Sequence, residues 1–104
     1  PHQLHRLAKR PSLALGRLGA ISNPGSGDIF VAFSTGNGGA VNEDTFNTVE
    51  QFPNNALNAL FRGAVEATEE AIVNAMVAAT TMTGADGLRV QGLPHDKVRV
   101  LFAE

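Results

Sequence analysis

The chain has 104 residues, of which ten are acidic and eight are basic, and 43% of its residues are apolar. This length and small net charge predict one soluble globular domain, or a domain fragment, over residues 1–104. Because the sequence contains no cysteine, disulfides, thiolate chemistry and zinc–thiolate sites are excluded, which fits a cytoplasmic location without excluding a periplasmic one.

The first 18 residues predict a helix that a proline interrupts. Apolar side chains recur mostly on one face, at Leu4, Leu7, Ala8, Leu15 and Leu18. The ring of Pro11 clashes with the preceding turn, so it should kink or split this helix, and Gly19 should end it.

Four basic residues, Arg6, Lys9, Arg10 and Arg17, precede the first acid, Asp28. Such a basic face could meet phosphate, nucleic acid or an acidic partner, but it is more typical of a solvated helix. No aromatic residue is interleaved with these bases, and the chain has no Tyr or Trp, so we expect no nucleic-acid partner.

A continuous apolar run from Ile29 to Phe33 predicts a strand that is covered on both faces. The flexible loop Ser22–Gly27 leads into this strand, and Gly36–Gly39 ends it. The polar stretch that follows, up to about Pro53, is long for a loop in a compact domain. It indicates either a functional surface or contact with material outside this chain.

A long helix is predicted from about Ala56 to Met82, because apolar residues repeat there at steps of three and four. Asn54 or Asn55 should cap its start, and Gly84 should end it in a left-handed conformation. Its apolar face is rich in alanine, which would let the helix approach a neighbouring sheet or helix closely.

The last part of the chain predicts a turn at residues 85–87, a short extended piece at residues 88–90 and a short helix. Pro94 should open this helix, which should run to about Phe102 with Val98, Leu101 and Phe102 facing inward. The predicted order is therefore helix, strand, long helix and short helix, an α/β (α+β) arrangement.

Only one convincing strand is predicted, although a strand covered on both faces needs sheet neighbours to pair its backbone. We therefore expect Ile29–Phe33 to pair with another chain, with a missing segment or with its own copy in a homo-oligomer. No apolar run approaches the roughly 20 residues that cross a bilayer, so no membrane partner is expected.

Ser26 and Asp28 are the leading candidates for chemistry. They lie two residues apart in a loop that runs directly into the apolar strand, and catalytic side chains are often held that way. A hydroxyl beside a carboxylate can orient an amine or another hydroxyl, and the flanking Gly25 and Gly27 would let a substrate come close. The alternative is that Gly-Ser-Gly-Asp is an ordinary turn composition.

The three histidines favour a surface interpretation. His2 and His5 are one helical turn apart, but no third ligand accompanies them, and His95 stands alone. We therefore expect no metal site and no Ser-His-Asp triad.

Glu66, Glu69 and Glu70 cluster in the long helix. Paired carboxylates can do acid–base work or hold a metal, but a solvated face is more typical, with Arg62 paired to Glu66 one turn on.

Several runs of residues match a known family in order along the chain. In the first part they are His2-Gln3-Leu4, Arg6-Leu7-Ala8, Gly16-Arg17, Gly25-Ser26-Gly27-Asp28-Ile29-Phe30 and Ala32-Phe33-Ser34-Thr35. In the second part they are Asn58-Ala59-Leu60-Phe61, residues 64–72, Asn74-Ala75, Thr81-Met82-Thr83-Gly84 and Asp86-Gly87. The chain thus resembles the DmpA/BapA family of L-aminopeptidase/D-esterase and β-peptidyl aminopeptidase enzymes, least so from Gly38 to Asn54.

This resemblance implies a fragment of a four-layer αββα sandwich, like that of the N-terminal-nucleophile hydrolases. It also implies a precursor that cuts itself in two and exposes a serine nucleophile at the start of the smaller chain. The α-amine of that serine can act as its base, so no cofactor is needed. The implied substrates are the N-terminal residues of peptides, amides and esters.

By the resemblance, Ser26 and Asp28 fall on an accessory serine and an acidic residue that assist the nucleophile. The family often has glutamate in place of Asp28, and Asn23-Pro24 and Pro11 also depart from its pattern. The nucleophile itself would lie upstream of the segment that matches Pro1, so no residue here takes that role. The partner would be a missing N-terminal segment or a larger subunit.

We therefore interpret the chain as the C-terminal part of the small subunit of a self-processing serine aminopeptidase, inactive alone. The alternative is a non-catalytic structural or oligomerisation module that assembles through its strand edge and its alanine-rich helix.

Overall fold

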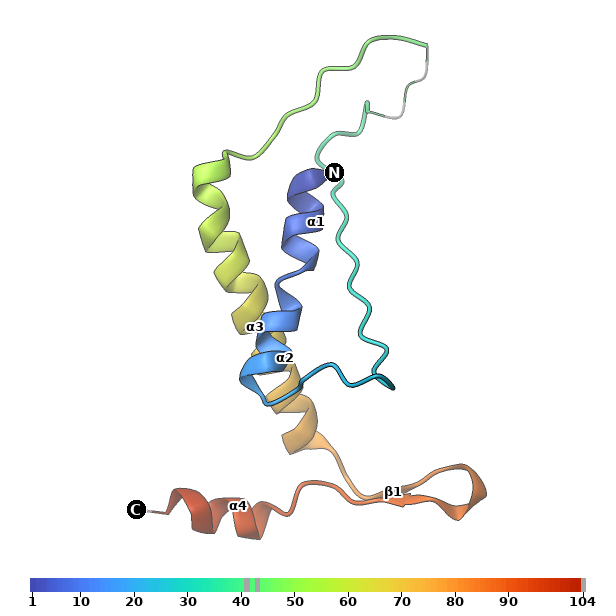
Figure 1. Cartoon of the computed structure of the whole chain (residues 1–104), viewed down its shortest axis with the longest axis vertical. Coiled ribbons are helices and arrows are strands. Elements are labelled where there is room, and N and C mark those ends of the chain that lie inside the picture. Colours follow the sequence, from blue (N-terminus) through green and yellow to red (C-terminus); the bar gives the residue numbers. More distant parts are fainter. Residues whose placement is uncertain (41, 43, 104) are drawn as a thin grey trace. The chain divides into compact units, whose positions relative to one another are not determined.

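The computed structural model describes residues 1–40, 42 and 44–103. The chain divides into two compact units, Pro1–Glu69 and Glu70–Glu104, and the boundary falls inside the long helix. The elements, in chain order, are α1 (His2–Ala8), α2 (Pro11–Arg17), a 3₁₀ turn (Asn54–Ala56), α3 (Leu57–Ala78), β1 (Met82–Thr83), a second 3₁₀ turn (Ala85–Gly87), β2 (Arg89–Val90) and α4 (His95–Phe102) (Figure 1).

Pro11 splits the first helical region in two, as its sequence predicts. α1 ends at Ala8, and Pro11 takes the first turn of α2, where the missing backbone N–H needs no partner.

Gly19 ends α2 with a φ of 92°. Its N–H donates to the Gly16 carbonyl (3.1 Å), and the next N–H, of Ala20, donates to the Leu15 carbonyl (3.0 Å). This paired pattern is a Schellman termination, so the predicted stop at Gly19 is confirmed.

Replacing Gly16 and Gly19 with alanine should change the stability of the chain in opposite directions. We expect Gly19→Ala to lower the free energy of unfolding by about 1 kcal/mol, because a Cβ is disfavoured at a positive φ. Gly16 lies inside α2 with open space where its Cβ would be, so Gly16→Ala should raise that free energy by up to about 1 kcal/mol. Urea unfolding followed by helical circular dichroism measures both. A Gly19→Ala chain as stable as the parent chain would contradict the Schellman assignment, and a loss of stability in Gly16→Ala would contradict the open space at position 16.

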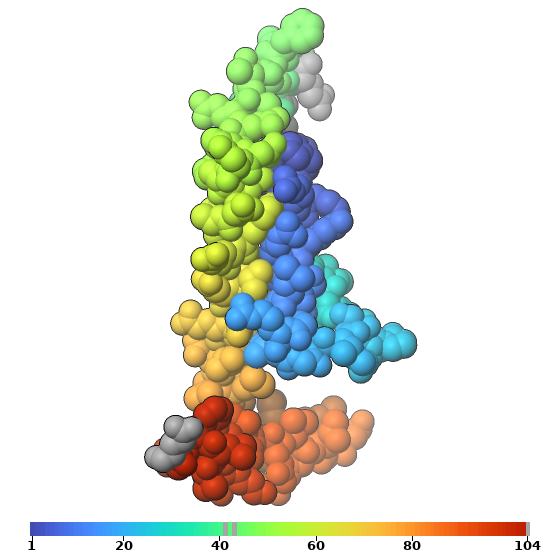
Figure 2. Space-filling model, turned by 60° about the vertical axis from the view of Figure 1, so that its left-hand side comes forward, coloured from blue at the N-terminus to red at the C-terminus, as the bar shows by residue number. Residues whose placement is uncertain are grey.

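The first unit packs α1 and α2 against the N-terminal half of α3, and the space-filling view shows these elements in contact (Figure 2). The buried apolar side chains of the described residues are Ala14 on α2 and Leu57 and Phe61 on α3. The guanidinium groups of Arg6 and Arg10 lie over the Phe61 ring, with their Cζ atoms 5.2 and 4.0 Å from the ring centroid. Cation–π attraction therefore reinforces this small core.

The predicted ends of the long helix need correction. α3 ends at Ala78 rather than Met82, because Met82 and Thr83 pair with Val90 and Arg89 in an antiparallel hairpin. Neither Asn54 nor Asn55 supplies a side-chain cap, since both lie inside the 3₁₀ turn that precedes α3. The side chain of Asn54 instead accepts a hydrogen bond from Gln3 Nε2 on α1 (2.9 Å).

In the second unit, the left-handed residues of the hairpin turn are Asp86 (φ 57°) and Gly87 (φ 74°). Gly84, predicted to take that conformation, is extended (φ −92°, ψ −158°), and its N–H donates to the Leu88 carbonyl (2.8 Å). The turn at residues 85–87 and the short strand after it are confirmed.

Gly92 follows the hairpin at a place where two backbone segments meet. Its N–H donates to Thr81 Oγ1 (3.1 Å), and a Cβ on Gly92 would lie 2.7 Å from the Ala79 carbonyl oxygen. Nearby, His95 Nε2 lies 2.9 Å from the Val77 carbonyl oxygen, so it donates to one of the last carbonyls of α3. These contacts connect the start of α4 to the end of α3.

The expectation that α4 buries its apolar residues is wrong within this chain. Val98 is half-buried, but Leu101 and Phe102 are exposed.

Candidate active site

Ser26 ends a short turn between α2 and the apolar segment, and Asp28 follows two residues later. The Ser26 N–H donates to the Asn23 carbonyl (2.7 Å), which closes a turn around Pro24 and Gly25. Proline at the second position and asparagine at the first are typical of such turns. Ser22, just before it, has a φ of 49°, an uncommon value for a residue with a side chain.

The side chains of Ser26 and Asp28 contact each other directly. Ser26 Oγ donates to Asp28 Oδ2 at 2.6 Å, and both residues are exposed. A short bond from a hydroxyl to a carboxylate is charge-assisted and stronger than a neutral one. The hydroxyl keeps its lone pairs and the carboxylate its second oxygen, so the pair can together accept hydrogen bonds from an ammonium group or another hydroxyl. The structure thus brings together the two residues that the sequence singled out.

The segment that follows, residues 29–35, is extended but is not part of a sheet (Figure 1). Ile29, Val31 and Phe33 are 85, 83 and 83% exposed, whereas Phe30 and Ala32 between them are half-buried. The prediction that both faces are covered is therefore wrong within this chain. The sheet found in the described residues pairs only β1 with β2, which agrees with the expectation that the chain supplies no neighbours for this segment.

The histidines take no part in the Ser26–Asp28 pair, since no hydrogen bond from a histidine to it occurs among the described residues. His2 and His5 lie on α1, and His95 contacts α3. Across residues 1–40, 42 and 44–103, no cluster of three potential metal ligands is found.

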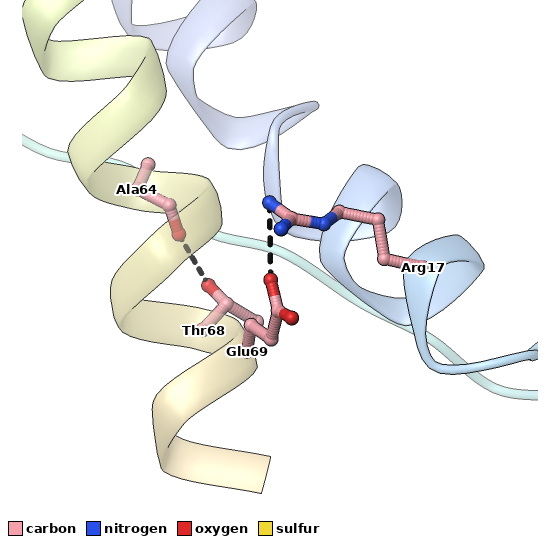
Figure 3. Close-up of polar contacts among 4 residues, drawn as sticks. All are labelled: Arg17, Ala64, Thr68 and Glu69. Carbon is pink, nitrogen blue, oxygen red and sulfur yellow. Dashed lines mark hydrogen bonds and ion pairs between the residues drawn. The ribbon is translucent and has the colours of Figure 1, made fainter. Parts of the chain in front are cut away.

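The glutamate cluster on α3 is anchored by a residue that the sequence did not suggest. Arg17 Nη1 pairs with Glu69 Oε2 at 3.0 Å, which joins the last turn of α2 to α3 (Figure 3). In the part of the chain described, no ion pair joins Arg62 to Glu66, so the pairing predicted along the helix is wrong. On the same stretch of α3, Thr68 Oγ1 donates to the Ala64 carbonyl at 2.6 Å. This polar face is structural and partly exposed, worth about 1 kcal/mol or less.

A shallow hollow of about 570 Å³ lies in the second unit, lined by residues that include Thr80, Arg89, Gln91 and His95. No helix within the described ranges is both long enough and apolar enough to span a membrane.

The fold of this chain is similar to part of the fold of solved hydrolases. It superposes on the L-aminopeptidase D-Ala-esterase/amidase from Ochrobactrum anthropi, described as a new variant of the Ntn hydrolase fold, with a TM-score of 0.84 and 42% identity. That match covers 98% of this chain and 29% of the other. A β-aminopeptidase from Burkholderia sp. matches with a TM-score of 0.77 and 44% identity over 99% of this chain and 30% of its own. The chain thus has an α/β structure that matches part of the Ntn hydrolase fold.

Sequence comparison identifies the family within this class of hydrolases. Residues 1–90 match Peptidase family S58, and the chain belongs to this family. It is 49% identical over 103 residues to the β-peptidyl aminopeptidase BapA of Sphingosinicella microcystinivorans, which covers 98% of this chain and 26% of BapA. BapA of Sphingosinicella xenopeptidilytica is 45% identical over 107 residues, covering 94% of this chain and 25% of that protein. The resemblance to the DmpA/BapA family is confirmed, and the chain spans about a quarter of these relatives.

Proposed function

We propose that this chain is one segment of a serine aminopeptidase that releases N-terminal residues from peptides, amides or esters. The observation that carries the proposal is the Ser26–Asp28 hydrogen bond, held at the mouth of an extended apolar segment in a chain of Peptidase family S58. In this proposal the pair assists a serine nucleophile that another segment supplies. Gly25 and Gly27 flank the pair and leave room for the substrate.

Exposed apolar side chains within each unit support the chain's place inside a larger body. In the first unit, Ile29, Val31 and Phe33 are 85, 83 and 83% exposed. In the second unit, Leu101 and Phe102 are 81 and 82% exposed. Exposed apolar residues that lie together mark interaction surfaces in soluble proteins, and in this proposal the other layers of a four-layer αββα sandwich would cover them.

The extended segment, residues 29–35, could pair with a strand that brings the nucleophile close to Ser26 and Asp28. Within the described part of the chain, the backbone groups of residues 29–35 form no backbone hydrogen bond, and a neighbouring strand would satisfy them. Ile29, Val31 and Phe33 are free to meet a second layer. If that neighbouring strand begins with the nucleophilic serine exposed by self-cleavage, the α-amine serves as base, and the Ser26–Asp28 pair receives hydrogen bonds from its hydroxyl and amine. No cofactor enters this scheme.

The test compares the chain alone with the complete protein in which it is a segment. We expect the purified 104-residue chain to release no p-nitroaniline from aminoacyl p-nitroanilides, because the nucleophile is supplied elsewhere. The complete protein should hydrolyse them and lose that activity on treatment with a serine-directed inhibitor. Serine-dependent hydrolysis by the chain alone, or an inert complete protein, would contradict the proposal.

A non-catalytic module remains the second candidate, and the exposed face of Ile29, Val31 and Phe33 is the observation that favours it. Such a module would assemble with its own copies through the unpaired segment and the alanine-rich helix. Light scattering distinguishes the two. A stable homo-oligomer that forms from the chain alone, with an inert complete protein, would favour the module.

A further inference from the structure

The long loop between the extended segment and α3 is closed at its base by one side chain. Asn37 Nδ2 donates to the Glu50 carbonyl (3.1 Å), and the Glu50 N–H donates to Asn37 Oδ1 (2.8 Å). The carboxamide thus pairs with the Glu50 backbone much as a neighbouring strand would. The orientation of the Asn37 carboxamide is fixed by these two hydrogen bonds. If Oδ1 and Nδ2 were exchanged, the NH₂ group would face the Glu50 N–H and the oxygen would face the Glu50 carbonyl. We call this pair of hydrogen bonds the Asn37–Glu50 clasp.

Asn37 is also followed by glycine, the pairing most prone to intramolecular attack on the asparagine side chain. Gly38 has no Cβ to hinder its backbone nitrogen, and open space surrounds the position where a Cβ would lie. The Asn37 carbonyl accepts the Ala40 N–H (3.0 Å), so Gly38 lies in a tight turn, and its own N–H has no backbone acceptor among the described residues.

We propose that Asn37 is a site of spontaneous deamidation and that its conversion releases the loop that the clasp closes. The Gly38 nitrogen attacks Asn37 Cγ, a C–N bond forms, and ammonia leaves with Nδ2 and the proton from Gly38. Water then opens the resulting succinimide at either carbonyl, which gives aspartate or isoaspartate. The step is redox-neutral, and water is its only co-reactant.

The product cannot remake the clasp. A carboxylate at position 37 still accepts the Glu50 N–H, but it has no hydrogen to donate to the Glu50 carbonyl, so two oxygens face each other there. The loop from residue 36 to 53 already holds three acids and no Lys or Arg, and the change adds another negative charge. Isoaspartate also lengthens the backbone by one atom, which shifts the chain relative to Glu50.

The clasp itself should hold deamidation back. Attack requires the side chain of Asn37 to turn so that Cγ meets the Gly38 nitrogen, whereas the clasp fixes both polar atoms on Glu50. The rate at Asn37 should therefore report how often the clasp opens.

Other asparagines in the sequence serve as internal controls. Asn23 precedes a proline, which has no N–H to attack. Asn42 and Asn47 lie in the same loop as Asn37 but precede glutamate and threonine. Asn58 and Asn74 lie inside α3.

The experiment incubates the 104-residue chain in mildly alkaline buffer, with and without denaturing urea, and follows each asparagine by peptide mass mapping. In urea we expect Asn37 to deamidate on the order of tenfold faster than Asn42 or Asn47, because only Asn37 precedes a residue without a Cβ. Gly38→Ala should remove this advantage. Equal rates at the three asparagines would overturn the assignment of the site.

A second variant, Glu50→Pro, removes the backbone N–H that holds Asn37 Oδ1 and leaves the Asn37-Gly38 sequence intact. Without urea, it should deamidate several-fold faster than the parent chain, and in urea the two should match. In aged parent chain, hydrogen exchange at the Glu50 N–H should quicken in the molecules that carry isoaspartate, because the extra backbone atom shifts residue 37 relative to Glu50. If Glu50→Pro and the parent chain deamidate equally without urea, the clasp does not control the reaction. Neither readout depends on hydrolase activity, so failure here is distinct from failure of the proposed function.

Discussion

Replacing Asp28 with asparagine in the complete protein is expected to lower kcat/KM for aminoacyl p-nitroanilides by about 10²–10⁴-fold, the usual loss when a proton-transfer group is removed. Asparagine keeps the size of the side chain and can still accept from Ser26 Oγ, which now lies 2.6 Å from Asp28 Oδ2. It lacks the negative charge that would stabilise an ammonium or a developing proton on the nucleophile. The fall should appear mainly in kcat, because in the proposed function the pair assists the nucleophile and does not bind the substrate.

Ser26→Ala tests the same contact from the other side. Because Ser26 and Asp28 share a hydrogen bond and act together in the proposed function, the double variant should lose little more activity than Asp28→Asn alone. Asp44→Asn is the matched control, since Asp44 is an exposed aspartate beyond the other end of the extended segment. Unchanged kinetics in Asp28→Asn, or an equal loss in Asp44→Asn, would exclude Asp28 from the chemistry.

Phe61→Ala should have the largest effect on stability, about 3–5 kcal/mol. Phe61 is one of the few buried apolar side chains of the first unit, and its loss leaves a cavity between α3 and the first two helices. The same change removes the ring over which Arg6 and Arg10 lie. Because typical domains are stable by about 5–15 kcal/mol, we expect α1 and α2 to detach from α3 in the isolated chain. Urea unfolding monitored by helical circular dichroism would show the loss.

The control for this change is Phe46→Ala, which truncates a fully exposed phenylalanine in the same unit. Its effect should stay within about 0.5 kcal/mol. A Phe61→Ala chain as stable as Phe46→Ala would show that the helices of the first unit are held together by other contacts.

Features decided by local stereochemistry could be predicted from the sequence. The split at Pro11 follows from its ring, the stop at Gly19 from its missing Cβ, and the Ser26–Asp28 contact from a spacing of two residues in a glycine-rich turn. The long helix was also predictable in its middle, where the apolar repeat is strongest.

Features that depend on residues distant in the sequence were missed. α3 stops at Ala78 because the residues after it pair with β2, and propensity along one segment does not contain that pairing. The partner of Glu69 is Arg17, contributed by another helix. The Asn37–Glu50 clasp spans 13 residues, and its only local signal is an asparagine after a strand-like run. The predicted cover of Ile29–Phe33 is wrong within this chain, because an apolar run indicates a segment that favours burial and does not say which residues bury it.

The close backbone contact at Gly92 shows why a glycine can be conserved for packing alone. It can be compared with Gly25 and Gly27, where no atom of the chain requires glycine. At position 92, any side chain would collide with the Ala79 carbonyl, so the chain's own packing demands glycine whatever the protein does. Gly25 and Gly27 meet no such atom and have no positive φ, so alanine would fit there in this chain. Among natural variants of the complete protein, glycine kept at 25 and 27 as strictly as at 92 would therefore reflect something that approaches from outside the chain. Such strict retention of glycine at positions 25 and 27 would record the approach of a ligand or a partner strand.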